Sequence, residues 1–228
     1  MKRRNFIYTT ASATTALLLS NLDAFASPLI KSQMKNDYKL VVLGTNWGFN
    51  GTVDAFCAKA KSEGYDGIEM WWPTKREGQD ELFTALKKHS LQVGYLVAGH
   101  ESNFTEHFAS FKKMIDAAVG NSNPKPLYIN CHSGKDYFSY ENNKRIIDHT
   151  LELAAKTGLK ICHETHRSRM MYAAPVTRNF IEKIPNLRLT LDVSHLCNLH
   201  YSLLTDHQET MTLALQLVYL LDARIVQA

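Results

Sequence analysis

The sequence contains no C-x-x-C pair, no G-x-G-x-x-G motif and no apolar run long enough to cross a membrane. The first absence argues against a zinc ribbon or a thioredoxin-type site. The second leaves a dinucleotide-binding domain without support. Because a spanning helix needs about 20 apolar residues, we expect no membrane span. The 228 residues are 45% hydrophobic and 21% charged, which excludes intrinsic disorder and collagen-like sequence.

Cysteine is scarce, with only four residues, Cys57, Cys131, Cys162 and Cys197. An oxidising compartment would permit disulfides between them. Three of the four, however, lie within apolar runs, where cysteine usually behaves as a small buried hydrophobe. We therefore predict free thiols.

The first 26 residues have the composition of an export signal. A basic head at Lys2-Arg3-Arg4 leads into an Ala/Thr/Leu stretch, and Ala24-Phe25-Ala26 has the A-x-A spacing of a cleavage site. Arg3-Arg4 followed by Phe6 resembles a bacterial twin-arginine signal, with an ordinary secretory leader as the alternative. We predict a signal peptide over 1–26, a linker over 27–38, one folded domain over 39–228, and a periplasmic or secreted protein.

The formal charge of +4 comes partly from that leader. Without residues 1–26, the chain has 23 Lys and Arg against 21 Asp and Glu, and no basic cluster. A near-neutral surface gives little support for binding to nucleic acid or to an anionic membrane.

Short β-branched runs alternate with longer segments of helical spacing, about every 30 residues. The predicted strands are 39–45, 66–72, 91–98, 127–131, 160–165, 187–193 and 219–226. The predicted helices are 52–63, 79–89, 105–119, 140–157, 175–184 and 206–217, with Gly158 as a left-handed C-cap of the fourth. This alternation predicts an α/β fold with a parallel sheet, either doubly wound or a (β/α)8 barrel.

Polar and ionisable residues recur where the predicted strands end, which favours the barrel, because barrel strands gather their C-terminal ends at one mouth. These residues are Asn46, Glu69, His100, Asn130 with His132, Glu164 with His166, and Asp192 with His195. In an open sheet they would be spread along a row instead.

The alternation within two strands places Glu164 and Asp192 in that mouth. Leu187, Leu189 and Leu191 share the face that packs on helices, so Asp192 faces the barrel axis. Likewise, Glu164 lies on the face opposite His163. Two carboxylates buried together repel unless a cation lies between them. Oxygen and imidazole ligands suit Mg, Mn, Co or Zn, so we predict a divalent metal site; two solvated strand-end residues are the alternative.

Four segments carry a resemblance to a known family: GYDGIEMW at 64–71, NCHSGKD at 130–136, CHETHR at 162–167 and LTLDVSH at 189–195. Together they resemble the sugar phosphate isomerase/epimerase family of xylose isomerase-like TIM barrels. In that family a Glu, an Asp, a His and a second Glu on strands five to eight hold a divalent ion. The two Glu ligands exchange a proton next to a sugar carbonyl.

The resemblance implies roles for individual residues. Glu164 takes the strand-five role as metal ligand and catalytic base, and Asp192 takes the strand-six role as metal ligand. His195 would contact the substrate, a sugar or sugar phosphate. The pocket-lining residues implied are His132, Glu69 and His100, and a sugar could stack on Trp71, Trp72 or Trp47.

The sequence departs from the family near its end. Asp222 stands where a metal-binding His is expected, and no eighth strand with a second Glu follows. We therefore expect an incomplete barrel of about seven strands, truncated at its last β/α unit, with Asp222 as a candidate ligand. Two unpaired strand edges favour self-association, so a homo-oligomer is one expected state.

Three functions follow from these observations. The first is a metal-dependent sugar isomerase or epimerase. The second is an inactive or truncated carbohydrate-binding barrel, favoured by the absent second Glu. The third, an enzyme resembling abasic-site endonucleases, needs more metal ligands and a basic face, and is the least supported.

Overall fold

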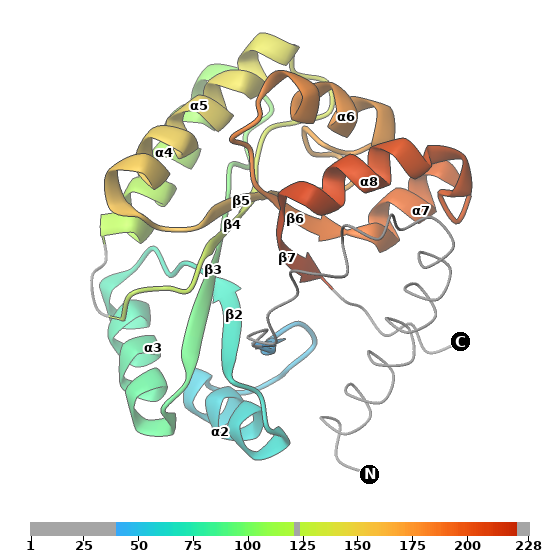
Figure 1. Cartoon of the computed structure of the whole chain (residues 1–228). Coiled ribbons are helices and arrows are strands. Elements are labelled where there is room, and N and C mark those ends of the chain that lie inside the picture. The colour runs from blue at the N-terminus through green and yellow to red at the C-terminus, as the bar shows by residue number, and fades with distance from the viewer. Residues whose placement is uncertain (1–39, 121–123, 223–228) are drawn as a thin grey trace.

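A computed structural model of the chain describes residues 40–120 and 124–222 (Figure 1). The predicted signal peptide and linker, residue 39, and residues 223–226 of the predicted seventh strand lie outside the described residues.

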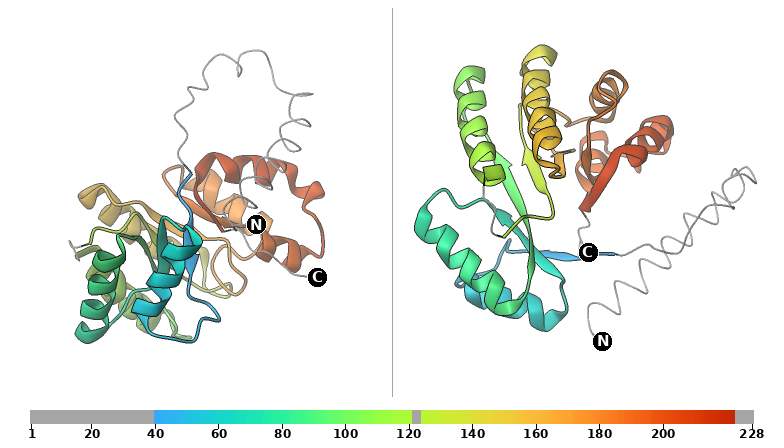
Figure 2. Two further views of the ribbon diagram at one scale, coloured as in Figure 1. Left: turned by 90° about the horizontal axis from the view of Figure 1, so that it is seen from below. Right: turned by 60° about the vertical axis from the view of Figure 1, so that its left-hand side comes forward.

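The strands form one parallel sheet whose spatial order follows the sequence order, β1 to β7. Their bounds are β1 Leu43–Thr45, β2 Gly67–Trp71, β3 Gln92–Ala98, β4 Ile129–His132, β5 Ile161–Glu164, β6 Leu189–Asp192 and β7 Val218–Asp222. A doubly wound sheet would reverse its strand order part-way, and this sheet does not. It curls with helices along its outer side, so the fold is an incomplete TIM-type barrel, as predicted (Figures 1 and 2).

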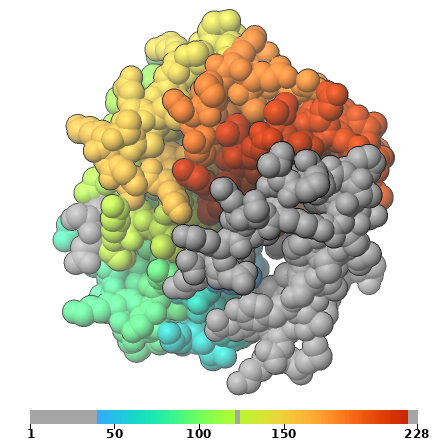
Figure 3. All heavy atoms as spheres, viewed as in Figure 1, coloured from blue at the N-terminus to red at the C-terminus, as the bar shows by residue number. Residues whose placement is uncertain are grey.

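Helices connect successive strands and cover the convex side of the sheet (Figure 2). Their bounds are α2 Val53–Glu63, α3 Arg76–His89, α4 Phe104–Gly120, α5 Tyr140–Thr157, α6 Ala174–Lys183, α7 Val193–His200 and α8 Gln208–Leu217, with a 3₁₀ turn at Thr205–His207. In the space-filling view, the segments after β4 form one continuous surface from yellow to red (Figure 3). Within the described residues, no helix combines the length and apolar character that a membrane crossing requires.

Local sequence signals account for both ends of helix α5. Helix α5 has the predicted bounds: the Ser139 side chain accepts from the Asn142 N–H at its start, and Gly158, with φ of 69°, donates to the Ala154 carbonyl at its end. Two differences stand out. Helix α3 begins three residues earlier than predicted, and helix α7 was not predicted at all.

The predicted division of the sheet into two faces is confirmed. Leu187, Leu189 and Leu191 are fully buried in the core between sheet and helices. All four cysteines are free thiols, as predicted, and three of them are buried.

His163 also lies on the helix-facing side of β5, where both ring nitrogens are hydrogen-bonded. Nε2 lies 2.8 Å from the Thr150 hydroxyl of α5, and Nδ1 lies 2.8 Å from the Ser133 hydroxyl. Because Thr150 gives its own proton to the Ile147 carbonyl, the ring must donate from Nε2 and accept at Nδ1. The neutral imidazole is therefore fully satisfied, and burial lowers the pKa of His163 to about 3.

This burial predicts a loss of stability in acid. A histidine with a lowered folded-state pKa takes up its proton first in the unfolded chain, so stability falls as the pH drops from about 6.5 toward about 3. The limiting slope for one such group is about 1.4 kcal/mol per pH unit. In urea unfolding at several pH values, His163→Gln should be less stable near neutrality but should lose less stability in acid. An unchanged acid slope in the variant would contradict the assignment.

Candidate metal and active site

The concave side of the sheet brings together two buried carboxylates from neighbouring strands, Glu164 at the end of β5 and Asp192 at the end of β6. Thr165 ties the two strand ends together. Its hydroxyl accepts from the Asp192 N–H at 2.9 Å and lies 3.2 Å from the Asp192 carbonyl, to which it donates. These contacts hold the two carboxylates at the same end of the sheet, as the strand alternation predicts.

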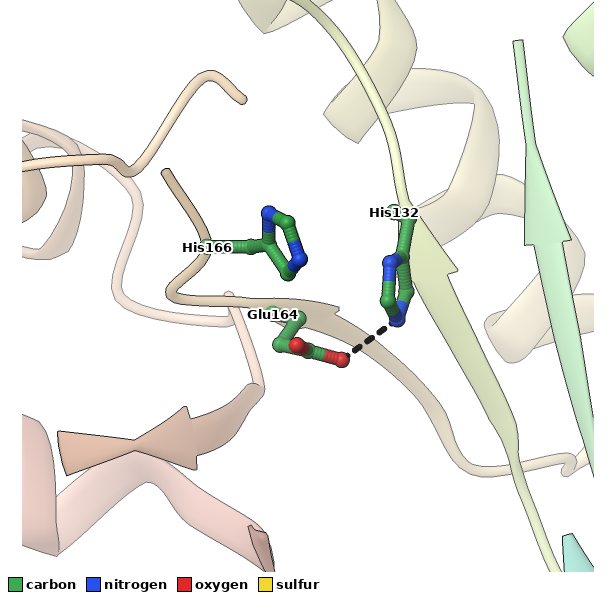
Figure 4. Close-up of side chains that lie close together, drawn as sticks. All are labelled: His132, Glu164 and His166. Atoms are coloured by element: carbon green, nitrogen blue, oxygen red, sulfur yellow. Dashed lines mark ion pairs between the residues drawn. The ribbon is translucent and has the colours of Figure 1, made fainter. Parts of the chain in front are cut away.

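The Glu164 side chain is held by one of its two oxygens (Figure 4). Oε2 lies 2.6 Å from Nε2 of His132 and accepts from the Asn130 side-chain amide at 2.8 Å. The other oxygen, Oε1, is buried and has no hydrogen-bond partner among the described residues. A buried carboxylate oxygen in this state calls for a partner such as an ion or a water molecule.

Asp192 is both a strand end and the N-cap of helix α7. Its Oδ1 accepts from the His195 N–H at 3.2 Å and from the Ser194 hydroxyl at 2.6 Å. The D-x-x-H spacing is thus the spacing of an N-cap and its third helical residue. That geometry also brings the His195 ring back, with Nε2 3.5 Å from Oδ2 of Asp192.

His166 completes a row of imidazoles around Glu164. Its ring centroid lies 5.0 Å from that of His132 (Figure 4) and 4.0 Å from that of His195. Nδ1 of His166 lies 2.6 Å from the Arg167 carbonyl, to which it can only donate. In the neutral ring this leaves the Nε2 lone pair available, the arrangement typical of metal-binding histidines.

Two groups of ligand atoms share Glu164: His132, Glu164 and His166 form one, and Glu164, Asp192 and His195 form the other. In each group the atoms lie within 4.8 Å of one another. The mixture of carboxylate oxygens and imidazole nitrogens suits a divalent metal ion. This donor set fits such an ion, and it includes Glu164, whose Oε1 atom has no hydrogen-bond partner among the described residues.

The pKa shifts of Glu164 and His166 favour the protonation states that bind a cation. Burial alone would raise the pKa of Glu164, but the hydrogen bond and charge of His132, helped by Asn130, outweigh it and lower the pKa. Burial lowers the pKa of His166 to about 4, against the raising effect of its hydrogen bond to the Arg167 carbonyl and with a further lowering by repulsion from His195. The carboxylate is therefore ionised and the imidazole of His166 neutral at neutral pH, the states in which both can bind a metal.

The other predicted substrate contacts lie around this centre. Trp71 is 36% exposed, and its ring lies 5.2 Å from that of His132 and 6.3 Å from that of His100, which is itself exposed. Trp72 points the opposite way and packs against Phe83 and Tyr95 in the core. Trp71 is therefore available to a ligand, whereas the suggested stacking role for Trp72 is wrong.

Two further carboxyl groups of the described residues, those of Glu69 and Asp222, face the same interior without belonging to either ligand group. Glu69, on β2, accepts from the Tyr128 hydroxyl at 2.5 Å. Asp222 pairs in register with Asp192, yet among the described residues it belongs to neither group. The charge of Asp222 nevertheless contributes to raising the pKa of Glu69, so Asp222 influences the electrostatics of the concave interior.

Four residues of the site were missed or given no role from the sequence alone. Asn130 and His166 were noted only as strand-end residues. Tyr128 was overlooked, although the alternation that places Asn130 and His132 inward places Tyr128 inward too. Arg169, which donates to the Gly99 carbonyl at 3.0 Å, carried no recognisable signal.

Residues 57–226 match the model of a family described as xylose isomerase-like TIM barrel. The chain belongs to this family. The match covers β2 to β7 and thus every side chain of the two ligand groups, and it agrees with the resemblance in the sequence. No curated protein matches this xylose isomerase-like barrel.

Solved structures share its fold at low identity. The probable 3-DHS dehydratase AsbF from Bacillus anthracis is 15% identical, with a TM-score of 0.60 over 80% of this chain and 72% of that one. A D-tagatose 3-epimerase-like protein is 14% identical, with a TM-score of 0.56 over 73% and 70%. The IOLI protein, solved with a bound zinc atom, is 14% identical, with a TM-score of 0.52 over 68% and 64%.

The paired carboxylates predict how metal binding responds to substitution. Glu164→Gln and Asp192→Asn each remove one anionic ligand, and Asn still caps a helix as well as Asp does. Since mutating outer-shell partners already costs about 10–100-fold in metal affinity, we expect each variant to weaken Zn²⁺ or Mn²⁺ binding by roughly 100-fold or more in calorimetric titration. Glu182→Gln, on the outer helix α6, is the matched control. Wild-type affinity in both site variants would rule out the site.

Proposed function

We propose that this protein is a metal-dependent sugar isomerase or epimerase that moves a proton next to a carbonyl group. The observation that carries the proposal is the Oε1 atom of Glu164, a buried carboxylate oxygen without a hydrogen-bond partner in the described part of the chain. It lies in a group that also holds Asp192 and His195.

Glu164 is the proton acceptor in this proposal. His132 and Asn130 hold Oε2, so Oε1 is the atom left for a ligand, and its two lone pairs allow it to lie beside a metal and a substrate carbon. A fixed carboxylate loses little freedom on reaction, which favours proton transfer in a defined direction. Removing the proton leaves negative charge on the neighbouring carbonyl oxygen.

Glu164, Asp192 and His195 would hold the metal, with His166 and His132 beside them. A divalent ion, when bound, supplies positive charge next to that developing oxygen charge. The protein's own contribution is to exclude water and to orient the substrate. Trp71 and His100 offer an exposed ring surface suited to the apolar face of a sugar.

The names of the structural neighbours support the same class of chemistry, since an epimerase-like protein and a probable dehydratase share this fold. These likenesses are below 25% identity, so they bear on the class of reaction and not on the substrate. A sugar or sugar phosphate is the substrate class that we propose.

The test is proton exchange in D₂O. Wild-type protein loaded with Mn²⁺ and incubated with D-tagatose, D-fructose or D-fructose 6-phosphate should incorporate deuterium next to the carbonyl, as read by NMR. Glu164→Gln should abolish incorporation, whereas Glu182→Gln should leave it unchanged. Binding of these sugars without any exchange would instead identify a carbohydrate-binding barrel and overturn the enzymatic proposal.

We also propose that the protein acts after export, because the basic head and the A-x-A sequence are typical of a cleaved signal. Mass spectrometry of the protein recovered from the periplasm should find Ser27 as its first residue. Replacing Arg3 and Arg4 by Lys should block export through the twin-arginine route. Recovery of full-length chain starting at Met1 from the cytoplasm alone would contradict this.

A further inference from the structure

Another carboxyl group, that of Glu69, faces the concave interior from β2, which lies three strands from β5 in the sheet. Glu69 accepts a hydrogen bond of 2.5 Å from the hydroxyl of Tyr128. Tyr128 immediately precedes β4, so this contact spans β3, which lies between the two strands. The two side chains therefore meet across an intervening strand, on its concave face.

The intervening strand leaves room for this contact only because it carries a glycine there. Gly94 is the register partner of Glu69. A Cβ atom added to Gly94 would lie 2.5–2.8 Å from three atoms of the Tyr128 ring, its hydroxyl oxygen included. Any side chain at position 94 would push the ring away, so the missing side chain is what lets Tyr128 reach Glu69.

The environment of the pair differs from that of Glu164. Burial raises the pKa of Glu69 to about 7, against the lowering effect of the Tyr128 hydrogen bond, and the charges of Glu164 and Asp222 raise it further. The titratable groups that act on Glu69 are Tyr128 and His132 from the β4 side, Glu164 on β5 and Asp222 on β7. When the surroundings of two carboxyl groups shift their pKa values in opposite directions, one group can act as an acid and the other as a base.

We propose that Glu69, held in place by Tyr128, is a second proton-transfer group that serves the substrate's oxygen atoms while Glu164 serves its carbon atoms. This inference rests on the proposed function, because it assigns an acid to the same reaction. Tyr128 is a positioning residue in this scheme, since it acts through Glu69.

The proton balance of the step closes. Starting from a ketose, Glu164 takes a proton from C1, and the C–H electron pair forms the C1=C2 double bond. Glu69 gives its proton to the C2 carbonyl oxygen, which yields a neutral enediol. Glu69 then takes the proton of the C1 hydroxyl as C1=O forms, and the electron pair of the double bond takes the proton from Glu164 at C2. Both groups return to their starting states.

The test separates exchange from turnover. Deuterium incorporation into recovered substrate reports the carbon proton transfer, and product formation also requires the oxygen proton transfer. With D-tagatose, D-fructose and D-fructose 6-phosphate in D₂O, Glu69→Gln should form product about 100-fold more slowly, the lower end of general acid contributions. It should retain more of its exchange, so that the ratio of exchange to turnover rises. Tyr128→Phe should shift that ratio in the same direction, and Tyr137→Phe, the same change at an exposed tyrosine, should not.

The outcomes distinguish the two proposals. Loss of exchange and turnover in equal proportion in Glu69→Gln would show a merely structural role and overturn the inference. Wild-type protein that neither exchanges nor turns over these sugars would overturn the proposed function and this inference with it.

A measurement without substrate gives independent evidence. Infrared spectra of the metal-free protein in D₂O at about pH 6 should contain the C=O band of a protonated carboxyl group that is missing in Glu69→Gln and present in Glu182→Gln. Absence of the band in wild-type protein would also overturn the inference.

Discussion

The site depends on one electrostatic constraint: two carboxylates, Glu164 and Asp192, are buried side by side at the ends of adjacent parallel strands. Bringing like charges out of water is unfavourable unless other groups compensate them. Part of the compensation is internal. His132 and Asn130 bind one oxygen of Glu164, and Asp192 caps α7, whose first turn favours negative charge. The other oxygen of Glu164 has no hydrogen-bond partner among the described residues, and a bound cation would complete the balance there.

Side chains alternate along each strand of the curled sheet, so that residues facing the helices stabilise the fold and residues facing the interior form the site. His163 and Glu164 are consecutive in β5 and have opposite surroundings. The histidine is fixed between Ser133 and Thr150 against the helices, whereas the glutamate faces the interior beside three imidazoles. Substituting the first should therefore act mainly on folding, and substituting the second mainly on ligand binding. The charged side chains of the interior are thus held by strands whose other face, toward the helices, is mostly apolar.

Much of this arrangement was predictable because it follows from two regular repeats in the sequence, the alternation of strands with helices and the alternation of side chains along each strand. The β/α alternation predicted the parallel sheet, and the leucines of β6 predicted that Asp192 points inward. Three features followed from contacts that a single sequence does not reveal. Asp192 was interpreted only as a ligand, so helix α7 was missed. The ring orientation of His166 depends on a turn at Arg167. The contact between Glu69 and Tyr128 depends on Gly94, which lies more than 30 residues before Tyr128 in the chain.

The central claim is that Glu164 and Asp192 share one divalent ion. The most direct measurement is a crystal structure of Mn²⁺-soaked protein with anomalous diffraction data. The account predicts an anomalous peak in contact with Oε1 of Glu164 and a carboxylate oxygen of Asp192. A fully occupied peak elsewhere, or no peak at saturating Mn²⁺, would contradict it.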